Sequence, residues 1–296
     1  FSKESQNRVA LEPLKVVLVQ TKRPTKIDYT PEELLSDFRN QLKLLGSATK
    51  EGSIIVFPET SNFSKTLSGF LDFSSAQAYF NNLSSEPLMI LDNIRSPEKD
   101  GLVSKTIFIN SKNGVAQFSD KRLLTPGGEY LPFIMKWPLW LLNRSIVNSF
   151  KYSQEFSKGT HTENLYFQDR TAKVVICSEI LSPGLFRDAD YQFIIGQSSF
   201  GMFKGDRQLE YQIMQALRFR AAENRKPAVL ASNFGRSYII DNNGNIIKST
   251  DSNDYQILTA DIVPNKGQTW YNKLGDLPIL LLSLAVFGLS VKPRKK

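Results

Sequence analysis

Residues 172–179 read Ala-Lys-Val-Val-Ile-Cys-Ser-Glu, an apolar and β-branched run that ends in a thiol and a carboxylate. This pattern predicts a buried β-strand over Ala172–Cys177. Ligands of open α/β sheets bind at the carboxyl ends of the strands, so Cys177 is a candidate nucleophile. A single cysteine at the end of an apolar run is more often an inert core residue, and the remaining sequence must decide between these interpretations.

Two other segments place a reactive side chain beside an apolar run. The sequence Ser-Ile-Ile-Val-Phe-Pro-Glu at residues 53–59 ends in the carboxylate of Glu59. Lys121 begins a turn-rich stretch that contains Pro-Gly-Gly-Glu at residues 126–129. Taken one at a time, such a glutamate or lysine is usually a solvated surface residue. All three segments nevertheless share one arrangement, a reactive group at the end of an apolar strand.

The rest of the chain alternates short apolar runs with helical patterns. Thr-Pro-Glu-Glu at residues 30–33 is typical of a helix that begins with a capping box, and Asp206 can cap a second helix. The alternation favours an α/β layered fold, and hairpin signals toward the C-terminus favour a mixed sheet. The strand candidates are Leu14–Gln20, Ser53–Pro58, Leu88–Asn93, Thr106–Asn110, Ala172–Cys177, Gln192–Gly196, Ala228–Asn233, Tyr238–Asp241 and Ile257–Ile262.

The composition excludes several classes of function. The 296 residues, 41% of them hydrophobic, suffice for one large core. With one cysteine and one histidine, the chain can supply neither an internal disulfide nor a zinc site, and His161 lies in a polar stretch predicted to be a solvated loop. The formal net charge is +8, but no phosphate loop or basic-aromatic RNA motif accompanies it. We therefore expect no metal, no cofactor and no nucleic-acid partner.

The C-terminal segment predicts a membrane helix. Leu277–Val291 carries no charge, and the basic tail Lys292–Lys296 follows it. Fifteen helical residues span about 22 Å, short of the ~30 Å hydrocarbon core, and Trp270–Gly275 brings the segment close to that length. The expected organisation is a catalytic domain over residues 1–272 and a transmembrane helix with a cytoplasmic tail over residues 273–296, which places the domain on the outer face. A buried core helix is the alternative.

The order Glu59, Lys121, Cys177 resembles the Glu-Lys-Cys triad of the nitrilase (carbon-nitrogen hydrolase) superfamily. Within that superfamily, the chain is most similar to the bacterial apolipoprotein N-acyltransferases, over nearly its whole length. The similarity rests on Phe-Pro-Glu at 57–59, on Lys121 with Glu129 eight residues later, and on Ile-Cys-Ser-Glu at 176–179. It implies an α/β fold, an α-β-β-α nitrilase-like sandwich. The family normally carries several membrane helices before this domain, and the present sequence begins at Phe1 without them.

The resemblance also implies a mechanism. Glu59 would act as the general base, and Cys177 would attack an ester carbonyl of a phospholipid to form a thioester. Lys121 and the backbone N–H of Ser178 would stabilise the oxyanion. The N-terminal amine of a lipoprotein would then accept the acyl chain. The implied location is the bacterial inner (cytoplasmic) membrane, with the catalytic domain on the periplasmic face.

Further residues take supporting or binding roles in this hypothesis. The resemblance gives Glu129 and Glu179 supporting roles around Lys121, although both could be ordinary surface residues. The apolar run at residues 132–142 follows the Lys121 loop and is rich in tryptophan, so it suits contact with a lipid surface, with ordinary core packing as the alternative. The residues expected to contact lipid or substrate are Phe133, Trp137, Trp140 and Phe200.

The chain departs from the family pattern at several positions. Ser178 replaces an aromatic residue, Gln-Ser-Ser-Phe-Gly at 197–201 lacks the usual Asn-Asp and Trp, and Gly127 stands where Phe is frequent. Two other functions therefore stay open. One is a carbon-nitrogen hydrolase, an amidase or nitrilase that acts on a small amide. The other is a membrane-anchored relative that has lost turnover.

Overall fold

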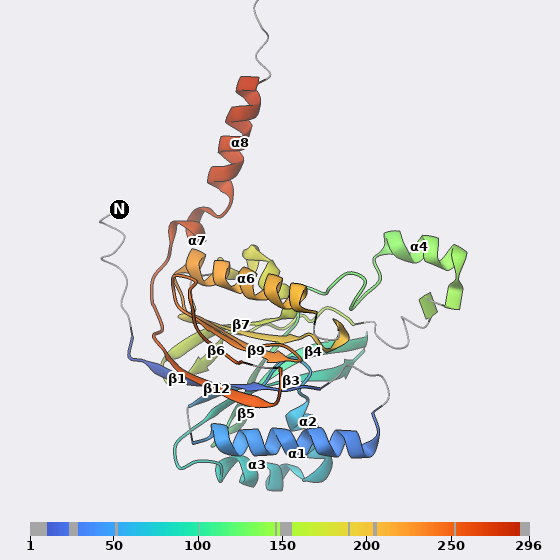
Figure 1. Cartoon of the computed structure of the whole chain (residues 1–296), viewed down its shortest axis with the longest axis vertical. Helices are drawn as coiled ribbons and strands as arrows, with labels where there is room; N and C mark the ends of the chain where they lie inside the picture. The colour runs from blue at the N-terminus through green and yellow to red at the C-terminus, as the bar shows by residue number, and fades with distance from the viewer. Residues whose placement is uncertain are drawn as a thin grey trace, which may run out of the picture.

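Two six-stranded sheets lie face to face, with helices on their outer faces (Figure 1). The computed structural model describes residues 11–23, 29–50, 53–99, 101–145, 147–148, 156–188, 190–203, 206–251 and 253–290. Helices α1 to α3 cover one sheet and α6 covers the other, so the layers are α-β-β-α. This arrangement confirms the predicted α/β layers and the nitrilase-like sandwich that the family resemblance implies.

The first sheet has the strand order β12-β1-β2-β3-β4-β5. Its central strands β1, β2 and β3 are parallel, and the others pair antiparallel, so the sheet is mixed as expected. The long hairpin of β3 and β4 extends beyond the end of β2. The bounds are β1 (Leu14–Gln20), β2 (Ile54–Val56), β3 (Met89–Glu98), β4 (Gly101–Asn110), β5 (Gly114–Asp120) and β12 (Gln256–Ile262).

The second sheet has the order β11-β10-β9-β8-β7-β6. Strands β7, β8 and β9 run parallel, which brings their carboxyl ends to one edge. The bounds are β6 (Leu165–Phe167), β7 (Arg170–Ile176), β8 (Phe193–Ser199), β9 (Ala228–Asn233), β10 (Tyr238–Ile240) and β11 (Ile246–Ser249).

The space between the sheets holds the central core. Alternate side chains of both sheets meet there, among them Leu18, Val56 and Val174, and all are almost completely buried. One polar side chain also lies at this interface. Gln197 on β8 donates a 2.6 Å hydrogen bond to the carbonyl of Phe57 and accepts one of 2.5 Å from Thr106 on β4. The two sheets are therefore joined by hydrogen bonds as well as by apolar packing.

Two helices begin at the capping residues that the sequence predicts. Helix α1 begins with the predicted capping box of Thr30 and Glu33, and Asp206 caps α6. The α-helices are α1 (Pro31–Ala48), α2 (Phe63–Phe70), α3 (Phe73–Asn81), α4 (Phe133–Leu142), α6 (Arg207–Asn224), α7 (Trp270–Leu274) and α8 (Leu277–Ser290). Within the described residues, the short 3-10 helices are η2 (Cys177–Leu181), η3 (Pro183–Phe186) and η4 (Gly201–Phe203).

The C-terminal segment differs from the prediction of one long membrane helix. Gly275, at φ 54°, separates α7 from α8, and a side chain there would collide with Arg187. The stretch Trp270–Gly275 thus does not lengthen α8, which has 14 residues. In the part of the chain that is described, no helix has both the length and the apolar content that a membrane crossing requires. The basic tail Lys292–Lys296 lies outside the described residues.

Candidate active site

The thiol lies at the junction of a strand and a helix. Cys177 follows the last residue of β7 and opens η2, with φ at 50°. A cysteine rarely adopts this left-handed conformation, which costs on the order of 1–3 kcal/mol. The sharp turn presents the thiol at the carboxyl edge of the second sheet instead of continuing the strand. The residue is partly exposed and lines the wall of a cavity.

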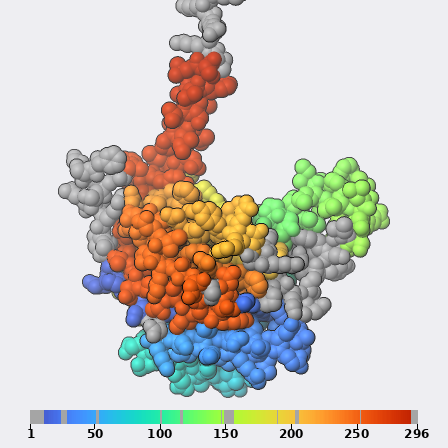
Figure 2. Space-filling view, in the orientation of Figure 1, coloured from blue at the N-terminus to red at the C-terminus, as the bar shows by residue number. Residues whose placement is uncertain are grey.

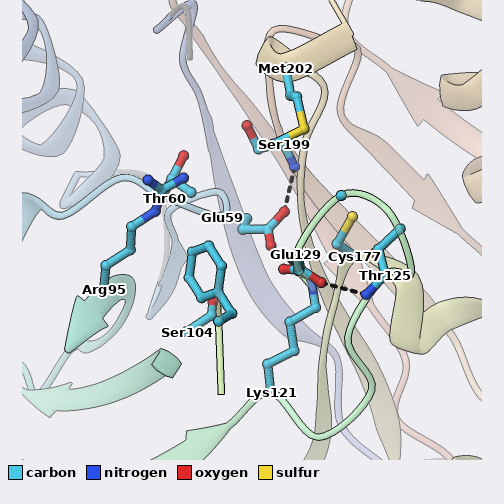
Figure 3. Close-up of a pocket in the computed structure, with 12 residues that line it drawn as sticks. Glu59, Thr60, Arg95, Ser104, Lys121, Thr125, Glu129, Cys177, Ser199 and Met202 are labelled. Atoms are coloured by element: carbon cyan, nitrogen blue, oxygen red, sulfur yellow. Dashed lines mark hydrogen bonds and ion pairs between the residues drawn. The ribbon is translucent and has the colours of Figure 1, made fainter. Parts of the chain in front are cut away.

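Glu59 reaches the same place from the first sheet. It follows β2, and the next residue, Thr60, has φ at 65° and donates its N–H to Asn93 Oδ1 at 2.8 Å. This turn aims the carboxylate back into the molecule, where only 6% of the residue is exposed. Its Oε2 accepts a 3.0 Å hydrogen bond from the N–H of Ser199, and the Cys177 thiol lines the same cavity (Figure 3).

Lys121 completes the group as a buried cation. Its Nζ lies 3.1 Å from Glu59 Oε1 and 2.7 Å from Glu129 Oε1, while 1% of the residue is exposed. The backbone N–H donates to the carbonyl of Ser104 at 2.8 Å, which fixes the start of the loop against β4. The structure therefore brings Glu59, Lys121 and Cys177 together, although 62 residues separate Glu59 from Lys121.

Burial and charge set the protonation of the three groups. Burial raises the pKa of the Cys177 thiol to about 12, and the charge of Glu59 adds to this effect. Burial also raises the pKa of Glu59, against the attraction of Lys121. For Lys121 burial acts to lower the pKa, but the negative charges of Glu59 and its neighbours raise it above the ordinary value. At neutral pH the site holds a neutral thiol beside an ammonium group.

Glu129 and Glu179 hold the loop of Lys121 in two different ways. Glu129 contacts the Lys121 ammonium directly, and its second oxygen accepts the N–H of Thr125 at 2.8 Å. Glu179 accepts the N–H of Arg122 at 2.8 Å and that of Ile176 at 2.9 Å. It thereby connects the Lys121 loop to the turn that carries the thiol. Burial raises the pKa of Glu179, while these N–H groups act to lower it.

A cavity opens above these groups. Figure 3 shows Glu59 at its centre, with Arg95 and Thr60 on one side and Cys177, Thr125 and Met202 on the other. The sequence reasoning missed most of this wall, because no local signal marks it. The lining residues are Glu59, Thr60, Arg95, Ser104, Lys121, Thr125, Gly128, Glu129, Phe156, Cys177, Ser199 and Met202.

The residues that were expected to contact lipid lie in two places. Phe133, Trp137 and Trp140 belong to α4, which projects from the sandwich and exposes most of its apolar side chains (Figure 2). Core packing of this segment is thus ruled out in the described structure. Phe200, in contrast, is fully buried in the core beneath α6, packed against Gly235, and is not part of the cavity wall. Its neighbours Ser199 and Met202 line the cavity instead.

Ser178 and His161 have contacts that the sequence did not reveal. The Ser178 hydroxyl donates a 2.8 Å hydrogen bond to the carbonyl of Leu123, which is a further link between η2 and the Lys121 loop. His161 lies 3.0 Å from Glu163 and packs on Phe118, outside the cavity wall. Among the described residues, no group of histidine, cysteine and acidic side chains is arranged to hold a metal ion.

The fold and the site agree with a family comparison. Residues 26–272 match the carbon-nitrogen hydrolase family, and the chain belongs to it. It is 28% identical to the apolipoprotein N-acyltransferase of Shewanella oneidensis, over 99% of this chain and 58% of that protein. It is 24% identical to the enzyme of the same name from Haemophilus ducreyi, over 96% of this chain and 57% of that protein. The chain therefore spans somewhat more than half the length of these relatives.

Solved structures of the same fold are more distant in sequence. An amidase from Nesterenkonia sp. AN1, with acrylamide added to its active-site cysteine, has a TM-score of 0.59 and 12% identity, covering 91% of this chain and 99% of the amidase. A glutamine-dependent NAD+ synthetase from Acinetobacter baumannii has a TM-score of 0.60 and 16% identity, covering 84% of this chain and 45% of the synthetase. At sequence identities this low, the structural similarity establishes the shared fold alone.

Proposed function

We propose that the chain is an acyltransferase that moves a fatty acyl chain from a phospholipid, through a thioester on Cys177, to the N-terminal amine of a lipoprotein. The observation that carries the proposal is the meeting of Glu59, Lys121 and Cys177 in one cavity, where the charges of Glu59 and Lys121 act on the thiol. The similarity to apolipoprotein N-acyltransferases over most of the chain supports the choice of substrates.

In the first step, the Cys177 sulfur attacks the ester carbonyl of the phospholipid. A thiol whose pKa is about 12 is protonated at neutral pH, so it must lose its proton during the attack. Glu59 takes that proton, and its own raised pKa makes it a stronger base than an exposed carboxylate. Collapse of the tetrahedral intermediate expels the glycerol oxygen, which receives the proton from Glu59. The products are a lysophospholipid and the acyl thioester.

The oxyanion of that intermediate needs donors that are in place before the reaction. Lys121 is one, because Glu59 and Glu129 hold its ammonium at 3.1 and 2.7 Å. The backbone N–H of Ser178 is the other, since the first N–H groups of a helix such as η2 have no acceptor within that helix. One such donor typically contributes about 10²–10³ in rate.

In the second step, the amine attacks the thioester carbonyl. Glu59, again unprotonated, accepts a proton from the attacking nitrogen and returns it to the departing sulfur, so that an amide and the free thiol result. The donor product leaves before the acceptor reacts. We therefore expect ping-pong kinetics for this reaction.

A lipid substrate requires contact with a membrane, and we propose that α4 and α8 make it. In α4, Phe133, Trp137 and Trp140 are exposed, and in α8 every described large apolar side chain is exposed. Both helices project beyond the rounded body (Figure 2). Exposed apolar patches of this size usually mark a site of interaction with a protein or a membrane. We propose that α8 enters the apolar layer of the membrane. Residues 1–272 would then form the catalytic unit.

The proposed location is the outer, periplasmic face of a bacterial inner membrane. Two considerations support it: the relatives named above are bacterial, and the basic tail Lys292–Lys296 favours the cytoplasmic side under the positive-inside rule. The proposed partners are a phospholipid donor, a lipoprotein acceptor and the membrane itself.

A second candidate is hydrolysis of a small amide. The amidase of the same fold favours it, since water in place of the amine would release a carboxylic acid from the thioester. The two candidates differ in their first substrate. An amidase would form its thioester from a soluble amide, without lipid.

Intact-mass analysis tests the proposal. The purified chain is incubated with phospholipid micelles, and the expected product is one acyl adduct that hydroxylamine removes. Cys177→Ala and Glu59→Gln should show none. An adduct on Cys177→Ala, or an adduct formed only from a soluble amide, would refute acyl transfer from phospholipid.

A further inference from the structure

Arg95 presents a guanidinium group to the catalytic cavity from a fixed strand. Its backbone N–H donates to Asn62 Oδ1 at 3.0 Å, and its carbonyl accepts from Lys65 at 3.0 Å. Both contacts anchor this part of β3, beyond the end of β2, against the start of α2. The side chain therefore extends from a rigid base. Figure 3 shows the guanidinium beside Thr60, with Glu59 between it and Cys177.

The Arg95 guanidinium is partly buried and lacks polar partners among the described residues. Within the described residues, no hydrogen bond or ion pair involves it, and its buried Nε has no partner. It lies over the ring of Phe156, whose centroid is 5.2 Å from Cζ. Guanidinium groups stay charged in proteins, and a buried charge without a partner is costly. The cavity thus holds a cation whose hydrogen-bond donors are free for a ligand.

The carboxylates of the site are already engaged elsewhere. Glu59 binds Lys121 and the N–H of Ser199, and Glu129 binds Lys121 and the N–H of Thr125. Arg95 feels the charge of Glu59 without touching it, and burial acts to lower the pKa of Arg95. A ligand with its own negative charge would supply the missing partner. Planar guanidinium groups bind carboxylates and phosphates through paired hydrogen bonds.

We propose that Arg95 binds the phosphodiester of the acyl donor and so selects phospholipids over neutral acylglycerols. This inference rests on the proposed function, because it assumes that the donor's ester lies at Cys177. In a phospholipid the glycerol unit joins the ester to the phosphate, so one donor can reach both Cys177 and Arg95. The apolar side chains of Phe156 and Met202 on the same cavity wall suit the hydrocarbon part.

Binding to an inactive variant tests the subsite without turnover. Cys177→Ala is titrated with a soluble short-chain phosphatidylethanolamine and with the diacylglycerol of equal chains. Adding Arg95→Gln should weaken phospholipid binding about 10- to 100-fold, the usual range for a charged hydrogen bond, and leave diacylglycerol binding unchanged. Arg95→Lys should recover part of the loss. Arg39→Gln, which removes an exposed arginine of α1, should change neither.

Turnover then separates this inference from the proposed function. In the chain with Cys177 intact, Arg95→Gln should raise the KM for phospholipid and change kcat little. Equal weakening of both lipids would show that Arg95 only balances charge in the site, and no weakening would show that it does not bind the donor. Either result overturns the inference. If phospholipid binds through Arg95 but no thioester forms, the inference stands and the proposed acyl transfer fails. A competition experiment adds inorganic phosphate or glycerol phosphate to the complex of Cys177→Ala with phospholipid. If both compounds displace the phospholipid equally well, the subsite recognises free phosphate and the inference is overturned.

Discussion

The carboxylate of Glu179 accepts the backbone N–H of Arg122 at 2.8 Å, across 57 residues of sequence. Because its other oxygen accepts the N–H of Ile176, one side chain sets the distance between the Lys121 loop and the Cys177 turn. Glu179→Gln places an amide N–H against one of these donors. We expect thioester formation to slow about tenfold or more, through kcat and not KM.

The comparison for this prediction is Glu163→Gln, which alters an exposed glutamate paired with His161. It should leave the rate unchanged. A Glu179→Gln protein that reacts as fast as the wild type would show that the loop keeps its place without this carboxylate.

Removing the buried ammonium should affect both rate and stability. Lys121→Met removes an oxyanion donor, which typically lowers the rate about 10²–10³-fold. It also leaves Glu59 and Glu129 buried without their cation, at a cost of about 3–5 kcal/mol in the free energy of unfolding. Single-turnover mass analysis and urea unfolding measure the two effects.

Lys105→Met is the matched control, since Lys105 pairs with Glu98 and Asp120 outside the cavity wall. Its effect on the rate should be small. If Lys121→Met lowered stability and kept full activity, Lys121 would be a structural residue only.

The thiol should react slowly with iodoacetamide near neutral pH. Because the pKa of Cys177 is raised to about 12, well above the ordinary value of a thiol, the thiolate fraction increases about tenfold per pH unit throughout pH 7–10. The rate of alkylation should follow that slope without a plateau. Glu59→Gln removes a negative charge that opposes ionisation, so it should speed alkylation at a given pH.

A plateau near pH 8 in the wild type would mean that Lys121 dominates and the thiol is already ionised in the resting site. Unchanged alkylation in Glu59→Gln would show that the carboxylate does not influence the sulfur.

The exposed apolar helices should carry binding to membranes. The double variant Trp137→Ser and Trp140→Ser should weaken co-sedimentation with phospholipid vesicles, because it removes two large exposed apolar side chains of α4 while α8 keeps its own. Tyr166→Ser, at an exposed aromatic residue of β6, is the control and should bind like the wild type. Equal binding of all three proteins would exclude α4 from the contact.

Much of the sandwich could be predicted from the sequence because its signals are local. Strands β1 and β9 have the predicted bounds, since both are short, largely apolar runs that are almost entirely buried. Strand β11 was missed, because its four residues are all exposed and show no inward face. Helices α2 and α3 were missed as well, and Asn62, which precedes α2, lacks a capping hydrogen bond.

The residues of the site also differ in whether a local sequence signal marks them. Glu59, Lys121 and Cys177 each follow a recognisable strand or motif, so their positions could be predicted. Arg95 could not, because only the tertiary fold determines that its guanidinium enters the cavity and lacks a partner. Phe200 was assigned to the substrate side on sequence position alone, and the chain turns its ring into the core instead.

Glu59 and Lys121 follow strands of the first sheet, whereas Cys177 follows β7 and Ser199 ends β8 in the second. Gln197 on β8 joins the two layers through its hydrogen bonds to Phe57 and Thr106. The distance between the base and the nucleophile therefore depends on how the two sheets are aligned, and neither sheet sets it alone. A slippage of one layer over the other by a fraction of a strand spacing would separate base from nucleophile while every secondary structure element survived. Damage at Gln197 would then show itself as lost chemistry well before the protein melts.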